Sequence, residues 1–245
     1  MLVLVAACAP RQPDHRQLLV FAAASLTDSL TELAEEYERT HGTEVSFSFG
    51  ASQSLAQQIA SGAPADLFLA AGMFPVDSLR ERNHIESEVE ALLSNKLVVV
   101  TAPDVPPFSS LKTLVDESIE RVAVADPEIA PAGTYARESL RSLGVWEDIE
   151  SKLIFGADVR ATLAYVEAGN VDVALVYSTD AQVADSLTVL DIVPLDSYTP
   201  IIYPAAIPLV SDKKDAAREF LAFLKGEKAM KVFARHGFGP APDSR

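Results

Sequence analysis

The sequence predicts an α/β fold built on sheets whose strands are mostly parallel. Short apolar runs that suit buried strands, such as residues 18–21 (LLVF) and 97–101 (LVVVT), alternate with segments whose apolar residues recur at helical spacing. Gly42 and Gly62 follow two of these helical segments and mark their ends. Strands separated by helices pair in parallel, because each helix carries the chain back to the start of the next strand.

The same patterns place each element along the chain. Strands are expected at residues 18–21, 45–49, 67–70, 97–101, 122–125, 153–155, 171–177 and 201–207. Helices are expected at residues 25–39, 54–61, 75–82, 132–142 and 159–168, with a long helical region from residue 211 onward. Ser25 with Asp28 matches a capping box at the first helix, and Pro131 suits the first turn of the fourth helix.

Composition and charge limit the possible partners. The chain has 245 residues and a formal net charge of −15 at pH 7. Such an acidic balance disfavours nucleic acid, whose phosphates need a basic surface, and disfavours binding to an anionic membrane. Any attraction for an anion must therefore be local. One cysteine, Cys8, rules out an internal disulfide, and the four histidines are too far apart in sequence for zinc-ligand spacing.

The first residues read MLVLVAACAP, an apolar run too short to span a bilayer. The run resembles the end of an export signal, and Val5-Ala6-Ala7-Cys8 resembles a bacterial lipobox, in which the cysteine is lipidated. Residues 9–17 are polar and contain proline, so residues 1–17 are expected to act as a signal remnant and tether. The alternative is a terminus without a defined structure.

Four strand-to-helix joints share one chemistry, found in the stretches FAAASLT, FGASQSLA, EIAPAGTYA and GADVRATLA. Each begins a helix and therefore offers free backbone amides at the positive end of the helix dipole. Serine hydroxyls add donors at the first two joints, and Tyr177 ends a later strand with a phenolic donor. Each feature alone also suits an ordinary cap or core residue, so spacing does not show that they meet.

The blocks FAAASLTDSL, FGASQSLAQQIASGAPADLFLAA, ADPEIAPAGTYARESLRSLGVW and GADVRATLAYVEAGNVDVALVYSTDA are similar to the periplasmic molybdate-binding proteins of ABC importers. YPAAIPLV and FLAFLKGEKAMKVFARHGF are similar too, so the resemblance covers about residues 18–239. It implies that a tetrahedral oxyanion is held by uncharged groups. The residues it assigns to the ligand are Ser25 and Ser52 through their hydroxyls, Ala132 and Val159 through their backbone amides, and Tyr177 through its phenol.

The resemblance also implies a type II periplasmic-binding-protein fold with a ligand cleft between two α/β lobes. Residues 18–100 with 204–245 would form the first lobe and residues 101–203 the second, joined by two crossings. The expected ligand is molybdate or tungstate, the metal entering only as its oxyanion, with no cofactor. A monomer outside the cytoplasm, with a possible lipid anchor at Cys8, would deliver it to the permease and ATPase subunits of an ABC importer.

Other interpretations stay open. The ligand could be another anion, such as sulfate, phosphate or an organic anion. Glu128 and Asp158 lie near two joints, and carboxylates there could complete an octahedral metal shell; Ser54 and the Ala51 backbone are further candidate contacts. A serine hydrolase is a weaker alternative, because neither serine lies in a G-x-S-x-G elbow, and a regulator's sensing half is disfavoured by the absence of a DNA-binding segment.

Overall fold

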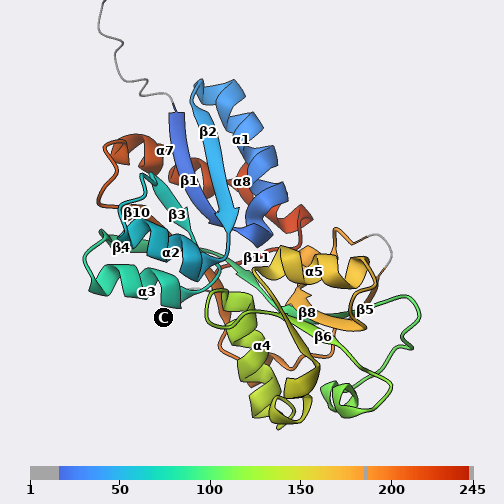
Figure 1. Cartoon of the computed structure of the whole chain (residues 1–245). Coiled ribbons are helices and arrows are strands. Elements are labelled where there is room, and N and C mark those ends of the chain that lie inside the picture. Colours follow the sequence, from blue (N-terminus) through green and yellow to red (C-terminus); the bar gives the residue numbers. More distant parts are fainter. Residues whose placement is uncertain (1–16, 185–186, 243–245) are drawn as a thin grey trace, which may run out of the picture.

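The structure, a computed structural model, describes residues 17–184 and 187–242. It has two α/β lobes, one above the other in Figure 1, each built on its own mixed sheet. The first sheet has the strand order β11-β4-β10-β3-β1-β2. Its strands are β1 (Gln17–Ala23), β2 (Glu44–Gly50), β3 (Leu67–Leu69), β4 (Ile85–Asn95), β10 (Ile201–Pro208) and β11 (Gly239–Pro240).

Helices cover both faces of this first sheet (Figure 1). They are α1 (Thr27–His41), α2 (Ser52–Ala60), α3 (Met73–Glu81), α7 (Lys214–Leu224) and α8 (Glu227–Arg235). Leu55 and Ile59 of α2 and Val76 of α3 pack with Phe68 of the sheet in one buried cluster. The apolar faces of α1, α7 and α8 belong to a separate, larger cluster, so the sheet is buried between two layers of helices.

The second sheet has the order β7-β6-β8-β5-β9. Its strands are β5 (Leu97–Thr101), β6 (Val122–Ala125), β7 (Leu153–Gly156), β8 (Val173–Tyr177) and β9 (Thr188–Leu190). Its helices are α4 (Pro131–Ser142), α5 (Val159–Glu167) and the short α6 (Ser178–Ala181). Four 3-10 turns complete the described chain, at Ala24–Leu26, Leu111–Val115, Glu147–Lys152 and Leu195–Ser197.

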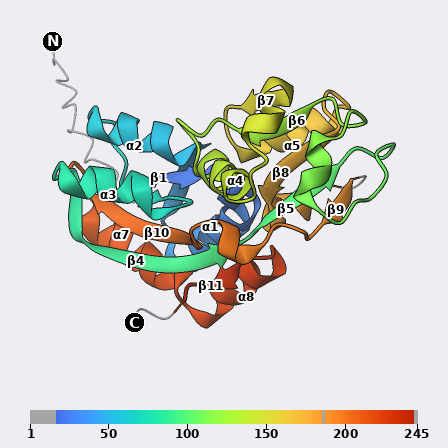
Figure 2. The same cartoon turned by 90° about the horizontal axis from the view of Figure 1, so that it is seen from below.

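The chain crosses between the lobes twice (Figure 2). β4 ends at Asn95 in the first sheet and β5 begins at Leu97 in the second, while β10 returns to the first sheet at Ile201. The boundaries expected at 100/101 and 203/204 therefore fall inside β5 and β10. Strand pairing corrects them, since all of β5 pairs with β8 and all of β10 lies in the first sheet.

Parallel pairing places the functional joints at the cleft. β1 pairs in parallel with both β2 and β3, and β6 pairs in parallel with both β7 and β8. The carboxyl ends of three strands therefore meet at one edge in each sheet. Ligands of open α/β sheets bind beside such ends, next to the starts of the helices that follow.

The expected elements are present with boundary shifts of a few residues, but one expectation is wrong and one long strand was missed. Ser25 does not cap α1: β1 runs on to Ala23, Ser25 lies inside a 3-10 turn, and Leu26 takes the cap position without a side-chain bond. Strand β4 was not expected. Its Glu-rich sequence is held by pairing with β10 and by ion pairs to α7, such as Arg218 with Glu86.

Among the described helices, none is both long and apolar enough to cross a membrane.

A glycine lets α4 begin close to β6. A Cβ atom on Gly133 would lie 2.0 Å from the Ala125 carbonyl oxygen. We expect Gly133→Ala to lower the free energy of unfolding by about 1–3 kcal/mol, because the helix start must move away from the strand. Chemical denaturation without ligand measures this. The matched control is Gly50→Ala, whose Cβ would meet only the Leu55 side chain at 3.8 Å; equal losses in both variants would contradict the expectation.

Candidate functional site

One small cavity lies between the lobes, where the carboxyl ends of the two sheets face each other. It contains about 220 Å³ of space that no atom occupies, part of which is open to solvent. Its lining consists of Ala23, Ala24, Ser25, Gly50, Ala51, Ser52, Ala71, Ala130, Pro131, Ala132, Asp158, Val159 and Tyr177. The structure therefore brings together all five residues that the sequence singled out. Their contact with a ligand stays a prediction.

The first lobe contributes two buried serines. Ser25 follows the end of β1, and its Oγ lies 2.8 Å from the Tyr203 hydroxyl. Ser52 is the first residue of α2, and its Oγ accepts a hydrogen bond of 3.0 Å from the Ala71 amide. Because that bond uses only a lone pair of Ser52, its hydroxyl proton remains free to donate into the cavity.

The second lobe contributes two helix starts. Ala132 is the second residue of α4 and Val159 is the first of α5. Neither amide has a hydrogen-bond acceptor within the part of the chain that the structure describes, as expected for the first turn of a helix. The Asp158 carboxylate caps α5 by accepting from the Arg160 and Ala161 amides, which leaves the Val159 amide for a ligand.

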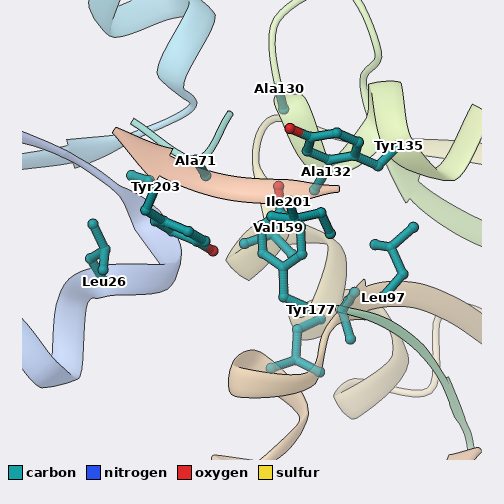
Figure 3. Close-up of a cluster of buried hydrophobic side chains, with 14 of the residues drawn as sticks. Leu26, Ala71, Leu97, Ala130, Ala132, Tyr135, Val159, Tyr177, Ile201 and Tyr203 are labelled. Carbon is teal, nitrogen blue, oxygen red and sulfur yellow. The ribbon is translucent and has the colours of Figure 1, made fainter. Parts of the chain in front are cut away.

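Tyr177, the last residue of β8, supplies the strongest sign of a missing partner. Its ring stands between Tyr203 on one side and Ala132 and Tyr135 on the other (Figure 3). Its side chain is 1% exposed, and its hydroxyl has no hydrogen-bond partner among residues 17–184 and 187–242. Burial raises the pKa of Tyr177 well above 10, so the phenol keeps its proton. An unpaired buried hydroxyl costs about 1–3 kcal/mol, which a bound acceptor would recover.

Contacts across the cleft show that the two lobes are closed. Arg160 of α5 binds Asp28 of α1, with Nη2 and Oδ2 2.5 Å apart. Gln53 of α2 donates to the Thr134 hydroxyl of α4 at 3.4 Å. Both contacts flank the cavity, since each pair includes a residue adjacent to a lining residue. Asp28 therefore joins the lobes and does not cap α1.

No lysine or arginine lines the cavity in the described structure. Its one carboxylate, Asp158, is turned to the α5 cap. Glu128 is not in the lining, and its carboxylate binds Arg137 at 2.8 Å. The described residues contain no group of three His, Cys, Asp or Glu side chains placed to hold a metal ion. These observations count against a carboxylate metal shell and favour an anion held by neutral donors.

The serines lack the partners of a nucleophile. Ser25 contacts the Tyr203 hydroxyl and Ser52 contacts a backbone amide, so no histidine or lysine is bonded to either in the described chain. Of the further candidates, Ala51 lines the cavity and Ser54 does not. A larger hollow between α1 and α8 is lined by interspersed charges, including Glu35, Arg39 and Lys231, and lies away from the strand ends.

Sequence reasoning missed the neighbours that set the geometry of the site. Ala71 follows the end of β3 as Ser25 follows β1, so the same rule about parallel strand ends could have found it. Tyr203 and Asn95 lie on the crossings and reach the site only through hydrogen bonds. No pattern in the sequence signals those bonds.

Two α/β lobes, two crossings and a cavity of uncharged donors between the lobes define a solute-binding protein of the type II periplasmic fold. The chain belongs to the family of bacterial extracellular solute-binding proteins, whose sequence profile matches residues 18–239. This family consists of binding proteins, not enzymes.

Similar proteins include a putative ABC transporter substrate-binding lipoprotein of Bacillus subtilis, 36% identical over 96% of this chain and 93% of its own length. The molybdate-binding protein ModA of Haemophilus influenzae is 37% identical over 91% of this chain and 89% of its own. The substrate-binding domain of a putative molybdenum ABC transporter from Clostridium difficile superposes with a TM-score of 0.71 at 35% identity, covering 92% and 99% of the two chains. The periplasmic molybdate-binding protein of Azotobacter vinelandii shares the fold, with a TM-score of 0.83 at 22% identity, covering 92% and 100%.

Burial gives Asp180 of α6 a measurable effect on stability. Burial raises the pKa of this carboxyl to about 7, although the charge of the nearby Arg160 guanidinium lowers that pKa. Folding therefore binds a proton that an unfolded aspartate, with a pKa of about 3.9, releases. The contribution of Asp180 to stability is present below about pH 4 and is lost as the pH rises through about 7.

We therefore expect the melting temperature of the wild type, relative to Asp180→Asn, to fall as the pH rises from about 4 to about 8. Thermal denaturation across that range measures the difference. Asp77→Asn, on an exposed pair within α3, is the control. A difference between wild type and Asp180→Asn that is constant across the range contradicts the assignment.

Proposed function

We propose that this protein captures molybdate, and also tungstate, outside the cytoplasm and delivers it to an ABC importer. The observation that carries the proposal is the cavity between the closed lobes. Uncharged donors from both lobes surround it, and one of them, the Tyr177 hydroxyl, has no partner in the described structure. The molybdate-binding names of two similar proteins support this choice of ligand.

Neutral donors can hold a dianion when they are fixed in position and dry. Hydrogen bonds to a charged acceptor contribute about 1.5–3 kcal/mol each. Ser25, Ser52 and Tyr177 through hydroxyls, with Ala132 and Val159 through amides, offer several such bonds. After the costs of ordering and desolvation, a net binding free energy of about −8 kcal/mol, or a micromolar Kd, is within reach.

The proposed partners are the permease and ATPase subunits of an ABC importer, in keeping with the family and with the name of the Bacillus subtilis relative. We propose that the protein acts as a monomer. Cys8 and residues 1–17 lie mostly outside the described residues, so lipid attachment at Cys8 remains our proposal from the sequence. Mass spectrometry of protein isolated from its native host would detect the lipid.

The ligand is tested by calorimetry and thermal shift with molybdate, tungstate, sulfate and phosphate. We expect molybdate and tungstate to bind and to raise the melting temperature. Sulfate should bind more weakly because a smaller ion stretches the bonds across the cavity. Phosphate should also bind more weakly, because its protonated oxygen would face hydrogen-bond donors and find no acceptor. If only phosphate or sulfate stabilised the protein, that anion would take the place of molybdate as the ligand.

Removing one donor should weaken binding without unfolding the protein. We expect Ser25→Ala and Tyr177→Phe each to raise the Kd for molybdate by about 10-fold or more, since each loses a hydrogen bond to a charged acceptor. Isothermal titration calorimetry measures the change, with Ser61→Ala and Tyr165→Phe as controls outside the cavity lining. Wild-type affinity in both site variants would remove these residues from the proposal.

Ligand binding should also depend on closure. Asp28→Asn removes the ion pair between Arg160 and α1, so we expect the Kd for molybdate to rise by about two- to fivefold, the effect of a partly exposed ion pair. Asp77→Asn breaks an ion pair that lies within one lobe and should leave the Kd unchanged. Equal effects of the two variants would show that closure does not use Asp28.

A further inference from the structure

A chain of hydrogen bonds runs from the crossings between the lobes to the ligand cavity. Asn95 ends β4 at the first crossing, and Tyr203 lies on β10 just after the second. The Asn95 side-chain amide donates to the Tyr203 hydroxyl at 3.0 Å, and the Tyr203 hydroxyl lies 2.8 Å from Ser25 Oγ. Neither Asn95 nor Tyr203 lines the cavity, so both can act on a ligand only through Ser25.

The orientation of the Asn95 amide is fixed by its neighbours. Its oxygen accepts from the Lys96 backbone amide at 2.9 Å and from the Ser178 hydroxyl at 3.0 Å. Its nitrogen donates to the Thr179 hydroxyl at 2.9 Å as well as to Tyr203. A flipped amide would set its NH₂ group against the Lys96 N–H, which cannot accept. Asn95 is therefore a donor toward Tyr203.

The direction of the next bond follows from the count of protons. Tyr203 is 1% exposed and has one proton, which burial retains by raising its pKa. Since its oxygen already accepts from Asn95, its proton goes to Ser25 Oγ, the other partner in the described structure. If Ser25 donated instead, the Tyr203 proton would have no acceptor there. The Ser25 hydroxyl thus accepts from Tyr203 and keeps its own proton for the cavity.

We propose that Asn95 and Tyr203 are positioning residues that fix Ser25 as a hydrogen-bond donor, and so favour oxyanions without a proton over protonated oxyanions. This inference rests on the proposed function, because it concerns the same site. Asn95 also bonds to Ser178 and Thr179, the two residues that follow Tyr177. The Asn95 side chain at the first crossing therefore connects Ser25, through Tyr203, with the end of β8. Ser25 is a donor of the first lobe, and the end of β8 carries Tyr177, a donor of the second.

The first test is a double-mutant cycle on molybdate affinity, measured by calorimetry. Tyr203→Phe should raise the Kd by about three- to tenfold in the wild-type background. It should change the Kd less than about twofold when Ser25 is already alanine, because the effect of Tyr203 passes through that serine. Tyr198→Phe is the matched control, since its buried hydroxyl accepts from the Leu97 amide on a crossing and does not touch Ser25. Additive effects of Tyr203→Phe and Ser25→Ala overturn the proposal.

The second test uses selenate and hydrogenarsenate at mildly alkaline pH, where both are mainly dianions of similar size that differ by one proton, in competition with molybdate. Tyr203→Phe frees Ser25 to accept, so the preference for selenate should shrink by about fivefold or more. Asn95→Asp provides a second variant if Tyr203→Phe is unstable. The new carboxylate accepts a hydrogen bond from the Tyr203 hydroxyl, so the Ser25 hydroxyl donates to the Tyr203 oxygen, and the preference should shrink there too.

An unchanged preference in both variants, including the case in which neither anion displaces molybdate, overturns the proposal. These outcomes are distinct from failure of the proposed function. A wild-type protein that binds no molybdate contradicts the proposed function itself. A wild-type protein that binds, with Tyr203→Phe matching the Tyr198→Phe control, contradicts only the role of Tyr203 and Asn95.

Discussion

The site depends on keeping a set of uncharged donors unpaired in the cavity between the lobes. Buried polar groups are normally hydrogen-bonded, and each unpaired one is costly. This fold leaves the Tyr177 hydroxyl and the Ala132 and Val159 amides without acceptors in the described structure. The cost is tolerable because two of the three are helix starts, whose first amides lack an intrahelical partner in any case. Under the proposed function, an anion in the cavity would accept from all three.

Sheet topology explains why the donors come together. Parallel pairing sets the ends of β1, β2 and β3 side by side in one lobe and those of β6, β7 and β8 in the other. Small residues lie where the strands end, as in Ala23-Ala24 and Ala51, so backbone and hydroxyl groups can approach a compact ligand. The alanines at the end of the first strand thus belong to the cavity wall. This shape depends on side chains that end at Cβ.

Local patterns were enough for most elements and for the candidate donors, because both depend on short-range chemistry. Strand runs, helical spacing and joint sequences are local, and resemblance to a family gathered the joints into one site. The features that the sequence did not predict depend on tertiary contacts. Ser25 looked like a helix cap, yet a longer β1 moves it into a 3-10 turn. β4 is held by its partners across the sheet and by α7, so its own residues signal it poorly.

The position of Arg160 is the clearest sign that the site avoids cations. Arg160 follows Val159 directly, so it lies close enough to the cavity that it could be expected to bind an anionic ligand. Its guanidinium instead binds the Asp28 and Asp180 carboxylates, and it is absent from the lining. A free guanidinium would attract sulfate, phosphate and carboxylates alike, because Coulomb attraction depends on charge more than on shape. Its pair with Asp28 uses this charge to join the lobes, and its pair with Asp180 lies within the second lobe. Under the proposed function, selection among anions is left to fixed dipoles that respond to size and protonation.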